Sequence, residues 1–187
     1  MLGYGAEAAA DPDSLTIEAQ VEYLRAMIDE PRVHLIGHSI GGVIGATYAH
    51  RYPEQVASFV NVEGNFTLAD AFWSGQLATM TPAEVDENLR ALPEIAYLLD
   101  FQPASTVQAM ARAVVEFTAD PGYERLLREV FAQTPVHLVA GGRSRAGWDV
   151  PDWALAGAAS YSEVPGVGHM VMDEAPEAFG ALLAGLL

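Results

Sequence analysis

The stretch VHLIGHSIGG, residues 33–42, places a serine directly after a run of apolar residues that is typical of a strand. Within it, GHSIG at residues 37–41 matches the pattern G-x-S-x-G, in which a serine occupies a sharp turn from a strand into a helix. The serine in such a turn holds a strained backbone conformation, and glycines two residues before and after it avoid a clash across the turn. The pattern predicts that Ser39 is a nucleophile raised above a sheet, with the Ile40 N–H directed at a developing oxyanion.

The segments around this turn alternate between helical and strand patterns. Apolar residues at helical spacing predict a helix over residues 15–30, and a second helix is expected over residues 41–52 because Pro53 ends the pattern. Short apolar runs predict strands over residues 33–37 and 57–62. A strand, a helix and a second strand in succession imply parallel pairing and the α/β fold class.

The middle of the chain has a different character from its two ends. Residues 66–134 read as helical segments, one of which begins with a capping-box pattern at Thr81 and Glu84. Two more strand patterns and a closing helix follow this block. We therefore divide the chain into a first core part at 1–65, a helical insertion at 66–134 and a second core part at 135–187.

The composition limits the classes of partner. The 187 residues are 51% apolar, which favours one globular domain with a hydrophobic core. The net charge is −16 and all nine basic residues are arginine, so nucleic acid and anionic membranes are disfavoured as partners. There is no cysteine, no cluster with metal-ligand spacing and no glycine-rich nucleotide loop, so we expect no metal and no cofactor. The longest apolar run, residues 178–187, is too short to span a bilayer, and no signal peptide is visible, so a cytoplasmic protein is expected.

A serine hydroxyl needs a base, and the chain offers five histidines. His34 and His137 lie inside strand patterns, and His50 lies near the end of a helix. His38 stands inside the turn, where we expect its side chain to point elsewhere. His169 follows the last strand on a glycine-rich loop, and such loops at the carboxyl end of a parallel sheet are where ligand chemistry gathers. The order of serine then histidine makes His169 the expected base.

Several segments together resemble the α/β-hydrolase superfamily. The resemblance is carried by GHSIGG (37–42), AHRYPEQV (49–56), VPGVGHM (164–170), EAPEAF (174–179) and LGYG (2–5). It covers nearly the whole chain, and it implies a partial α/β-hydrolase fold with a mostly parallel sheet of about four strands. It also implies a Ser-His-acid mechanism, with the helical insertion acting as a cap over the site.

The acid has two candidates, Glu63 and Asp149. In many members of this superfamily it is an aspartate shortly after the strand that here reads PVHLVAG, but this chain has Arg143, Ser144 and Arg145 there, and Asp149 is the first carboxylate. A second pattern, found in some haloalkane dehalogenases, places the acid after the preceding strand, where Glu63 stands. The neighbours of Glu63 look buried, and a buried carboxylate needs a partner such as an imidazole N–H. This favours Glu63, with Asp149 as the alternative.

The resemblance also implies that something is missing upstream. Four strands and a helix normally precede the loop that LGYG resembles, and the second oxyanion donor comes from that part of the fold. The strand at residues 33–37 would then have one open edge, which we expect to favour self-association. The chain is therefore interpreted as a truncated copy of a longer hydrolase or as one completed by a partner.

The sequence predicts a serine hydrolase that cleaves small apolar carboxylic esters or related acyl compounds through an acyl-enzyme. Thioesterase, lactonase, C–C hydrolase and perhydrolase chemistry stay open within the same fold. A dehalogenase is disfavoured because it needs a carboxylate where Ser39 stands. The alternative of a different class is a non-catalytic or truncated protein that acts as an interaction module through its open sheet edge.

Overall fold

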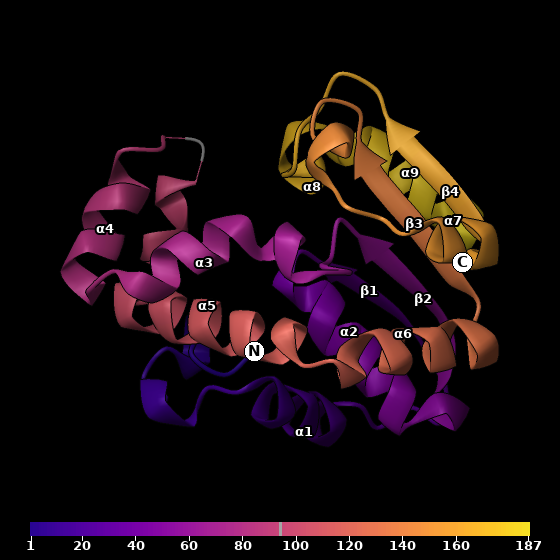
Figure 1. Ribbon diagram of the computed structural model, residues 1–187, viewed down its shortest axis with the longest axis horizontal. Coiled ribbons are helices and arrows are strands. Elements are labelled where there is room, and N and C mark those ends of the chain that lie inside the picture. The colour runs from indigo at the N-terminus through magenta and orange to yellow at the C-terminus, as the bar shows by residue number, and fades with distance from the viewer. Residues whose placement is uncertain (94) are drawn as a thin grey trace. The chain divides into compact units, whose positions relative to one another are not determined.

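Residues 1–93 and 95–187 are described by a computed structural model, shown in Figure 1. The chain forms two units, each made from two separate segments. The helical unit comprises Met1–Asp29 and Ala71–Asp120, and the sheet unit comprises Glu30–Asp70 and Pro121–Leu187. The division into 1–65, 66–134 and 135–187 stays a prediction about domain organisation.

The sheet unit is built on parallel strands in the order β1-β2-β3-β4, and the four arrows run the same way in Figure 1. The strands are β1 (Val33–His38), β2 (Val56–Val62), β3 (Val136–Gly141) and β4 (Ser160–Val164). Within the described residues this confirms the α/β class and a parallel sheet of four strands.

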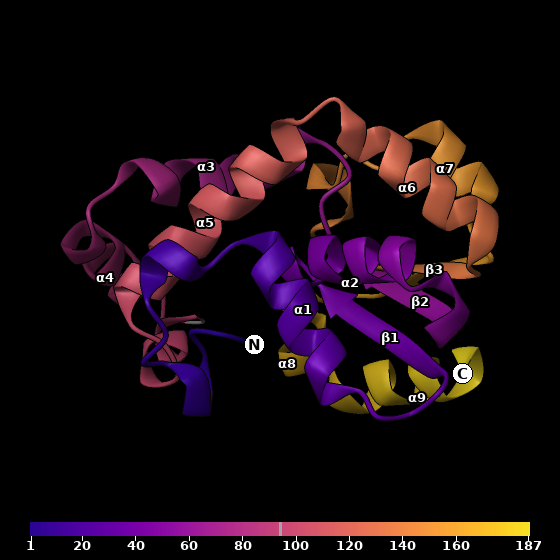
Figure 2. The same ribbon diagram turned by 90° about the horizontal axis from the view of Figure 1, so that it is seen from below.

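Helices cover both faces of this sheet, which explains why its strands read as nearly continuous apolar runs. The helices of the sheet unit are α2 (Ile40–Arg51), α6 (Gly122–Gln133), α7 (Asp152–Gly157), α8 (Val171–Glu174) and α9 (Pro176–Leu186). Figure 2 shows α2 and α6 on one side of the sheet and α9 on the other. On the α9 side, side chains from strands, from helices and from the loop after β4 form one buried cluster: Val60, Val62, Val139, Val164, Val167, Val171 and Phe179.

The helical unit is formed by α1 (Ile17–Met27), α3 (Phe72–Thr79), α4 (Pro82–Arg90) and α5 (Ala104–Ala119). Leu77, Val85, Leu89 and Ala111 form its buried cluster. The capping box is confirmed, because the Thr81 hydroxyl accepts from the Glu84 N–H and the Glu84 carboxylate accepts from the Thr81 N–H. No helix within the described residues is long and apolar enough to cross a membrane.

The parallel sheet brings four loops to one edge. Ser39 follows β1 directly, and Glu63 follows β2 directly. Ser144 comes shortly after β3, and His169 lies in the loop between β4 and α8. Because the carboxyl ends of parallel strands share one edge of the sheet, side chains far apart in the sequence meet there.

Candidate active site

The turn at Ser39 has the strained backbone that its sequence predicts. Ser39 has φ 53° and ψ −122°, a conformation that residues with a side chain rarely adopt. Its N–H donates to the Val62 carbonyl at 3.0 Å, and its own carbonyl accepts from the Gly42 N–H at 2.8 Å. The turn is therefore tied to the end of β2 on one side and to the start of α2 on the other.

Two glycines allow this turn, and only one of them, Gly37, is among the two that the sequence suggested. A Cβ added to Gly37 would lie 2.3 Å from the Gly41 carbonyl oxygen, which confirms the expected clash at Gly37. A Cβ on Gly41 would meet nothing within 4 Å, so the expectation for Gly41 is wrong, because its Cβ direction is open. The second close approach is at Gly42, where a Cβ would lie 2.6 Å from the Gly64 Cα.

Ile40 is the first residue of α2. The first N–H groups of a helix have no partner within the helix and lie at its positive end. The Ile40 N–H is therefore suited to receive a negative oxygen beside Ser39, and its role as an oxyanion donor stays a prediction.

Glu63 is a buried carboxylate whose two oxygens have separate partners. Its backbone has φ 46°, and its side chain is 4% exposed. Oε2 lies 2.6 Å from His169 Nδ1. Oε1 accepts from the Gly141 N–H at 2.7 Å and from the Ser144 hydroxyl. A buried charge is stable only when it is hydrogen-bonded, and this one has a donor from each of two further loops.

These hydrogen bonds decide the ionisation of Glu63. Burial acts to raise the pKa of Glu63, but the hydrogen bonds from His169, Ser144 and Gly141 outweigh it and leave the pKa below its ordinary value. The carboxylate is therefore ionised at neutral pH and accepts from His169 Nδ1–H. The His169 side chain is 46% exposed, so its other nitrogen, Nε2, is the one left for an incoming proton.

The structure joins His169 to Glu63 and gives no hydrogen bond between the Ser39 hydroxyl and His169 among the described residues. The contact between the turn and His169 is made by His38, the residue before the serine. His38 Nε2–H donates to the backbone carbonyl of His169 at 2.8 Å, and the two rings lie 4.5 Å apart. Ser39 is thus one residue away from a side chain that packs on His169.

The expectation that the His38 side chain points elsewhere is wrong. His38 pairs in register with Val62, which belongs to the buried cluster that also contains Val167 and Val171. Val167 and Val171 stand two residues before and two residues after His169 in the sequence. The loop that carries His169 therefore packs on the same face of the sheet as the His38 side chain. Burial, with the charge of His169, lowers the pKa of His38 to about 4, so this ring stays neutral.

Asp149, the alternative acid, has other partners. Its Oδ2 accepts from the Thr67 hydroxyl at 3.0 Å, and its N–H donates to Asp70 Oδ1 at 2.6 Å. Asp70 also accepts from the N–H groups of Phe66 and Thr67. Burial raises the pKa of Asp70, although these N–H groups act against the rise. The Asp149 loop is thus joined to the loop after β2, and the carboxylate that meets His169 is Glu63.

Aromatic side chains hold the segment that follows Glu63. The Trp148 indole N–H donates to the Gly64 carbonyl at 2.9 Å, and the Tyr123 hydroxyl donates to the Asn65 carbonyl at 2.7 Å. Burial raises the pKa of Tyr123, so its hydroxyl stays protonated and able to donate. Neither aromatic residue could be linked to the site from the sequence, because each contact joins segments more than fifty residues apart.

An ion pair holds the loop that carries His169. Arg143 Nη2 lies 2.6 Å from Glu174 Oε2, and Arg143 Nη1 donates to the Gly166 carbonyl at 2.9 Å. Glu174 Oε1 accepts from the Gly168 N–H at 3.0 Å. Both sides of His169 are therefore fastened to the loop after β3.

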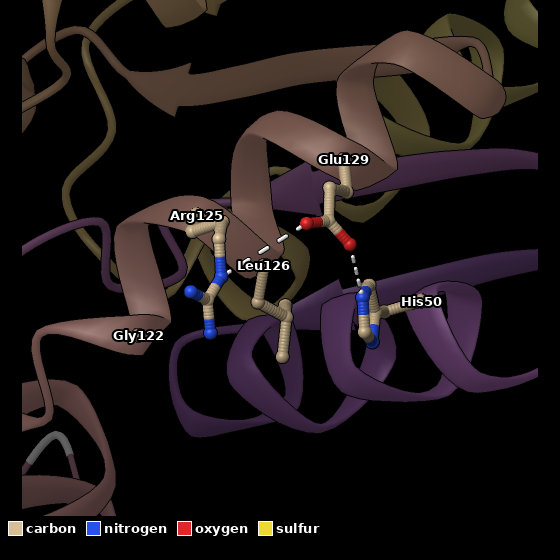
Figure 3. A pocket seen from close by; sticks show the side chains of 5 residues that line it. All are labelled: His50, Gly122, Arg125, Leu126 and Glu129. Atoms are coloured by element: carbon tan, nitrogen blue, oxygen red, sulfur yellow. Dashed lines mark hydrogen bonds and ion pairs between the residues drawn. The ribbon is translucent and has the colours of Figure 1, made fainter.

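A hollow of about 520 Å³ lies elsewhere on the sheet unit, between α2 and α6 (Figure 3). It is lined by His50, Gly122, Arg125, Leu126 and Glu129. His50 Nε2 lies 2.7 Å from Glu129 Oε2, and Arg125 Nε lies 4.0 Å from Glu129 Oε1. Its charged groups are thus paired with one another, and none is a predicted site residue. In the part of the chain that the structure describes, no group of three or more acidic, histidine or cysteine side chains could hold a metal ion.

Comparison with known proteins identifies the family to which the fold belongs. The family model for the α/β hydrolase fold matches residues 1–152. No curated protein matches the chain in sequence. Among solved structures, the chain is similar to a carboxylesterase of the ammonia-oxidizing thaumarchaeon Nitrososphaera gargenis, with 17% identity, a TM-score of 0.71, and coverage of 95% of this chain and 74% of that one.

Two other solved structures share the fold. A thermophilic esterase from Thermogutta terrifontis is 19% identical with a TM-score of 0.67, over 95% of this chain and 74% of that one. An N-acyl homoserine lactonase, determined with N-hexanoyl homoserine, is 22% identical with a TM-score of 0.66, over 94% of this chain and 71% of that one. At these identities the likeness establishes the fold alone.

Proposed function

Because the chain belongs to the α/β-hydrolase fold family, we propose that it is a serine hydrolase that cleaves carboxylic esters. Ser39 is the nucleophile, His169 is the base and Glu63 is the acid that orients the base. The observation that carries this proposal is the contact between His169 Nδ1 and Glu63 Oε2 at 2.6 Å, at the same sheet edge as the strained turn of Ser39. A buried carboxylate, an imidazole and a serine on a strained turn are the groups that acyl transfer requires.

The proposed reaction runs through an acyl-enzyme. His169 Nε2 takes the Ser39 proton while Oγ attacks the ester carbonyl, and the negative oxygen that forms accepts from the Ile40 N–H. The C–O bond to the alcohol then breaks, and His169 returns the proton to the leaving alcohol. Water attacks the acyl-enzyme with the same proton transfers in turn, which releases the carboxylic acid and restores Ser39.

The charge of Glu63 determines which nitrogen of His169 acts as the base in this cycle. An ionised carboxylate accepts from Nδ1–H and so keeps the proton on that nitrogen, which leaves Nε2 as the basic one. When His169 becomes an imidazolium, the same carboxylate stabilises the positive charge. Its lowered pKa supports this role, because the charge is then present throughout the neutral range.

An ester is the substrate class that the related structures favour. A carboxylesterase and a thermophilic esterase share the fold of this chain, and the lactonase among them acts on a cyclic ester. We propose small apolar carboxylic esters as the first substrates to try, since attack of a serine on the carbonyl carbon is the same step in every ester.

A fluorophosphonate probe and a series of p-nitrophenyl esters test the proposal. We expect the probe to modify Ser39 in the folded protein and the acetate or butyrate ester to be hydrolysed. Ser39→Ala should remove both signals, whereas Ser160→Ala, far from this sheet edge, should leave both. If a cooperatively folded sample shows neither labelling nor hydrolysis, the proposal that the protein is a serine hydrolase is refuted.

One observation favours a second candidate function. β1 lies at the end of the strand order, and within the described residues its outer edge pairs with no strand, while Ile36 is 46% exposed. An open edge of this kind can pair with a strand from another chain. An interaction module is therefore the alternative, and a folded protein that forms strand-paired complexes but is inert to the probe would favour it.

A further inference from the structure

Ser144 makes a side-chain contact at this sheet edge that the three-residue mechanism does not use. It stands just after β3 and precedes the short 3-10 helix Arg145–Gly147. Its hydroxyl hydrogen-bonds to Glu63 Oε1, and its N–H donates to the Gly141 carbonyl at 3.2 Å. The hydroxyl also lies 3.2 Å from the Gly141 carbonyl, but the carboxylate oxygen is nearer and charged, so it takes the proton.

The two oxygens of Glu63 have different tasks. Oε2 faces His169, so the proposed chemistry concerns that oxygen. Oε1 faces the loop after β3 and receives the Gly141 N–H and the Ser144 hydroxyl. Of these two donors, Gly141 contributes backbone, so Ser144 is the only side chain of the described residues that holds Oε1.

Holding Oε1 also fixes where Oε2 points. A carboxylate group is planar, and with one oxygen anchored by two donors it cannot turn about its last bond. The Glu63 backbone lies in the left-handed region at φ 46°, so the base of the side chain is also constrained. The direction of the Oε2 lone pairs toward Nδ1 therefore depends on the anchor at the far oxygen.

We propose that Ser144 is a positioning residue that locks the Glu63 carboxylate against the loop after β3 and so presents Oε2 to His169. This inference rests on the proposed function in that Glu63 acts as the acid. It predicts that the hydroxyl of Ser144, and not its size, determines which nitrogen of His169 carries the proton. The hydrogen bond supports it, because the Ser144 hydroxyl is one of the contacts that lower the pKa of Glu63 against the rise that burial causes.

The test compares side chains that differ in the hydroxyl alone. Ser144→Thr keeps the hydroxyl. Ser144→Val has nearly the same shape as Ser144→Thr but lacks the hydroxyl. Ser144→Ala removes the hydroxyl with the least bulk. Ser160→Ala is the control, because it also removes a serine hydroxyl that makes a side-chain hydrogen bond, with Ser160 Oγ 2.8 Å from His137 Nδ1, but at the opposite end of the sheet.

The readout that needs no turnover is the tautomer of His169, followed by ¹⁵N NMR of labelled histidine in the full chain, with His169→Ala to assign the signal. We expect the Nδ1–H tautomer in the wild type, in Ser144→Thr and in Ser160→Ala, and a mixture of both tautomers in Ser144→Ala and Ser144→Val. With a p-nitrophenyl ester, kcat should fall about 10- to 100-fold in the two variants without the hydroxyl, the range for one hydrogen bond to a charged group, while KM changes little.

The outcomes separate this inference from the proposed function. An unchanged His169 tautomer in both Ser144→Ala and Ser144→Val would overturn the positioning role, whatever the activity. If Ser144→Ala does not fold, the comparison of Ser144→Thr with Ser144→Val decides alone. A tautomer change in a protein that hydrolyses no ester and resists the fluorophosphonate would support Ser144 as the anchor of Glu63 and reject the hydrolase.

Discussion

The two ends of the sheet use the same kind of histidine contact for different purposes. At the amino end, His137 Nδ1 lies 2.8 Å from the Ser160 hydroxyl, between β3 and β4. At the carboxyl end, His169 Nδ1 lies 2.6 Å from the Glu63 carboxylate. A neutral hydroxyl can only accept a hydrogen bond from an imidazolium, whereas an ionised carboxylate also neutralises its charge and so stabilises it more strongly. The partner of Nδ1, and not the histidine itself, therefore distinguishes the His137 contact from that of His169, the proposed base.

The surroundings reinforce this contrast. Burial lowers the pKa of His137, and the charge of His34 lowers it further, so the amino end disfavours a charged ring. At the carboxyl end, the hydrogen bonds to Glu63 keep its pKa below the ordinary value despite burial. One end of the sheet is thus suited to neutral packing and the other to proton transfer.

Removing each histidine is the strongest way to break the comparison. His169→Ala should lower kcat for a p-nitrophenyl ester by about 10⁶-fold, the loss typical of a missing triad base. His137→Ala should leave kcat within a few-fold of the wild type and act on stability alone. Steady-state kinetics on both variants, with circular dichroism to show that each is folded, make the measurement. Similar losses in the two variants would contradict the distinction.

The carboxylate partner gives the next largest effect. Glu63→Gln keeps the shape of the side chain but loses the charge, and it should lower kcat by about 10⁴-fold, as replacement of a triad acid by its amide does. Asp149→Asn should keep kcat nearly unchanged, because Asp149 bonds to Thr67 and Asp70. A large loss in Asp149→Asn with a mild one in Glu63→Gln would move the acid to the loop after β3.

The smallest effect is a pH dependence of stability that arises from His38. Burial and the charge of His169 lower the pKa of His38 to about 4 from 6.5, while Glu63 and Asp173 act in the opposite direction. The unfolded chain therefore binds a proton at this position before the folded chain does, so His38 makes the protein less stable as the pH falls from about 6.5 to about 4. Urea unfolding should show this loss in the wild type, and His38→Phe should lack that component.

Matched urea series for the two proteins decide that point. Parallel pH slopes between about 6.5 and 4 in the wild type and in His38→Phe would show that His38 is not buried in its neutral form against His169. A shallower slope in His38→Phe would sharpen the comparison, because it would show that His38 is buried at the carboxyl end in its neutral form.

The sequence was most informative where the structure is local. The turn at Ser39 could be predicted because spacing within five residues encodes it, and Glu63 could be proposed because its neighbours looked buried. The contact of His38 with His169 could not, since it depends on which sheet face a loop 131 residues away returns to. The contact of Ser144 with Glu63 spans 81 residues and leaves no pattern in the sequence.

The glycines near Ser39 show the same limit of sequence spacing. Gly37 is required for a local reason, because the turn brings it against its near neighbour Gly41. Gly42 is required because α2 passes close to Gly64 in the loop after β2, which is a tertiary contact. Sequence spacing therefore identifies the strained turn but not the packing that surrounds it.

The rate at which a fluorophosphonate modifies Ser39 tests the pairing of Glu63 with His169 most directly, because it reports activation of the serine without substrate binding preferences. The wild type, Glu63→Gln and Asp149→Asn would be compared at one probe concentration, with mass spectrometry to locate the label. We predict that Glu63→Gln slows labelling by at least about 100-fold and that Asp149→Asn labels at the wild-type rate. Labelling of Glu63→Gln at the wild-type rate would contradict the account.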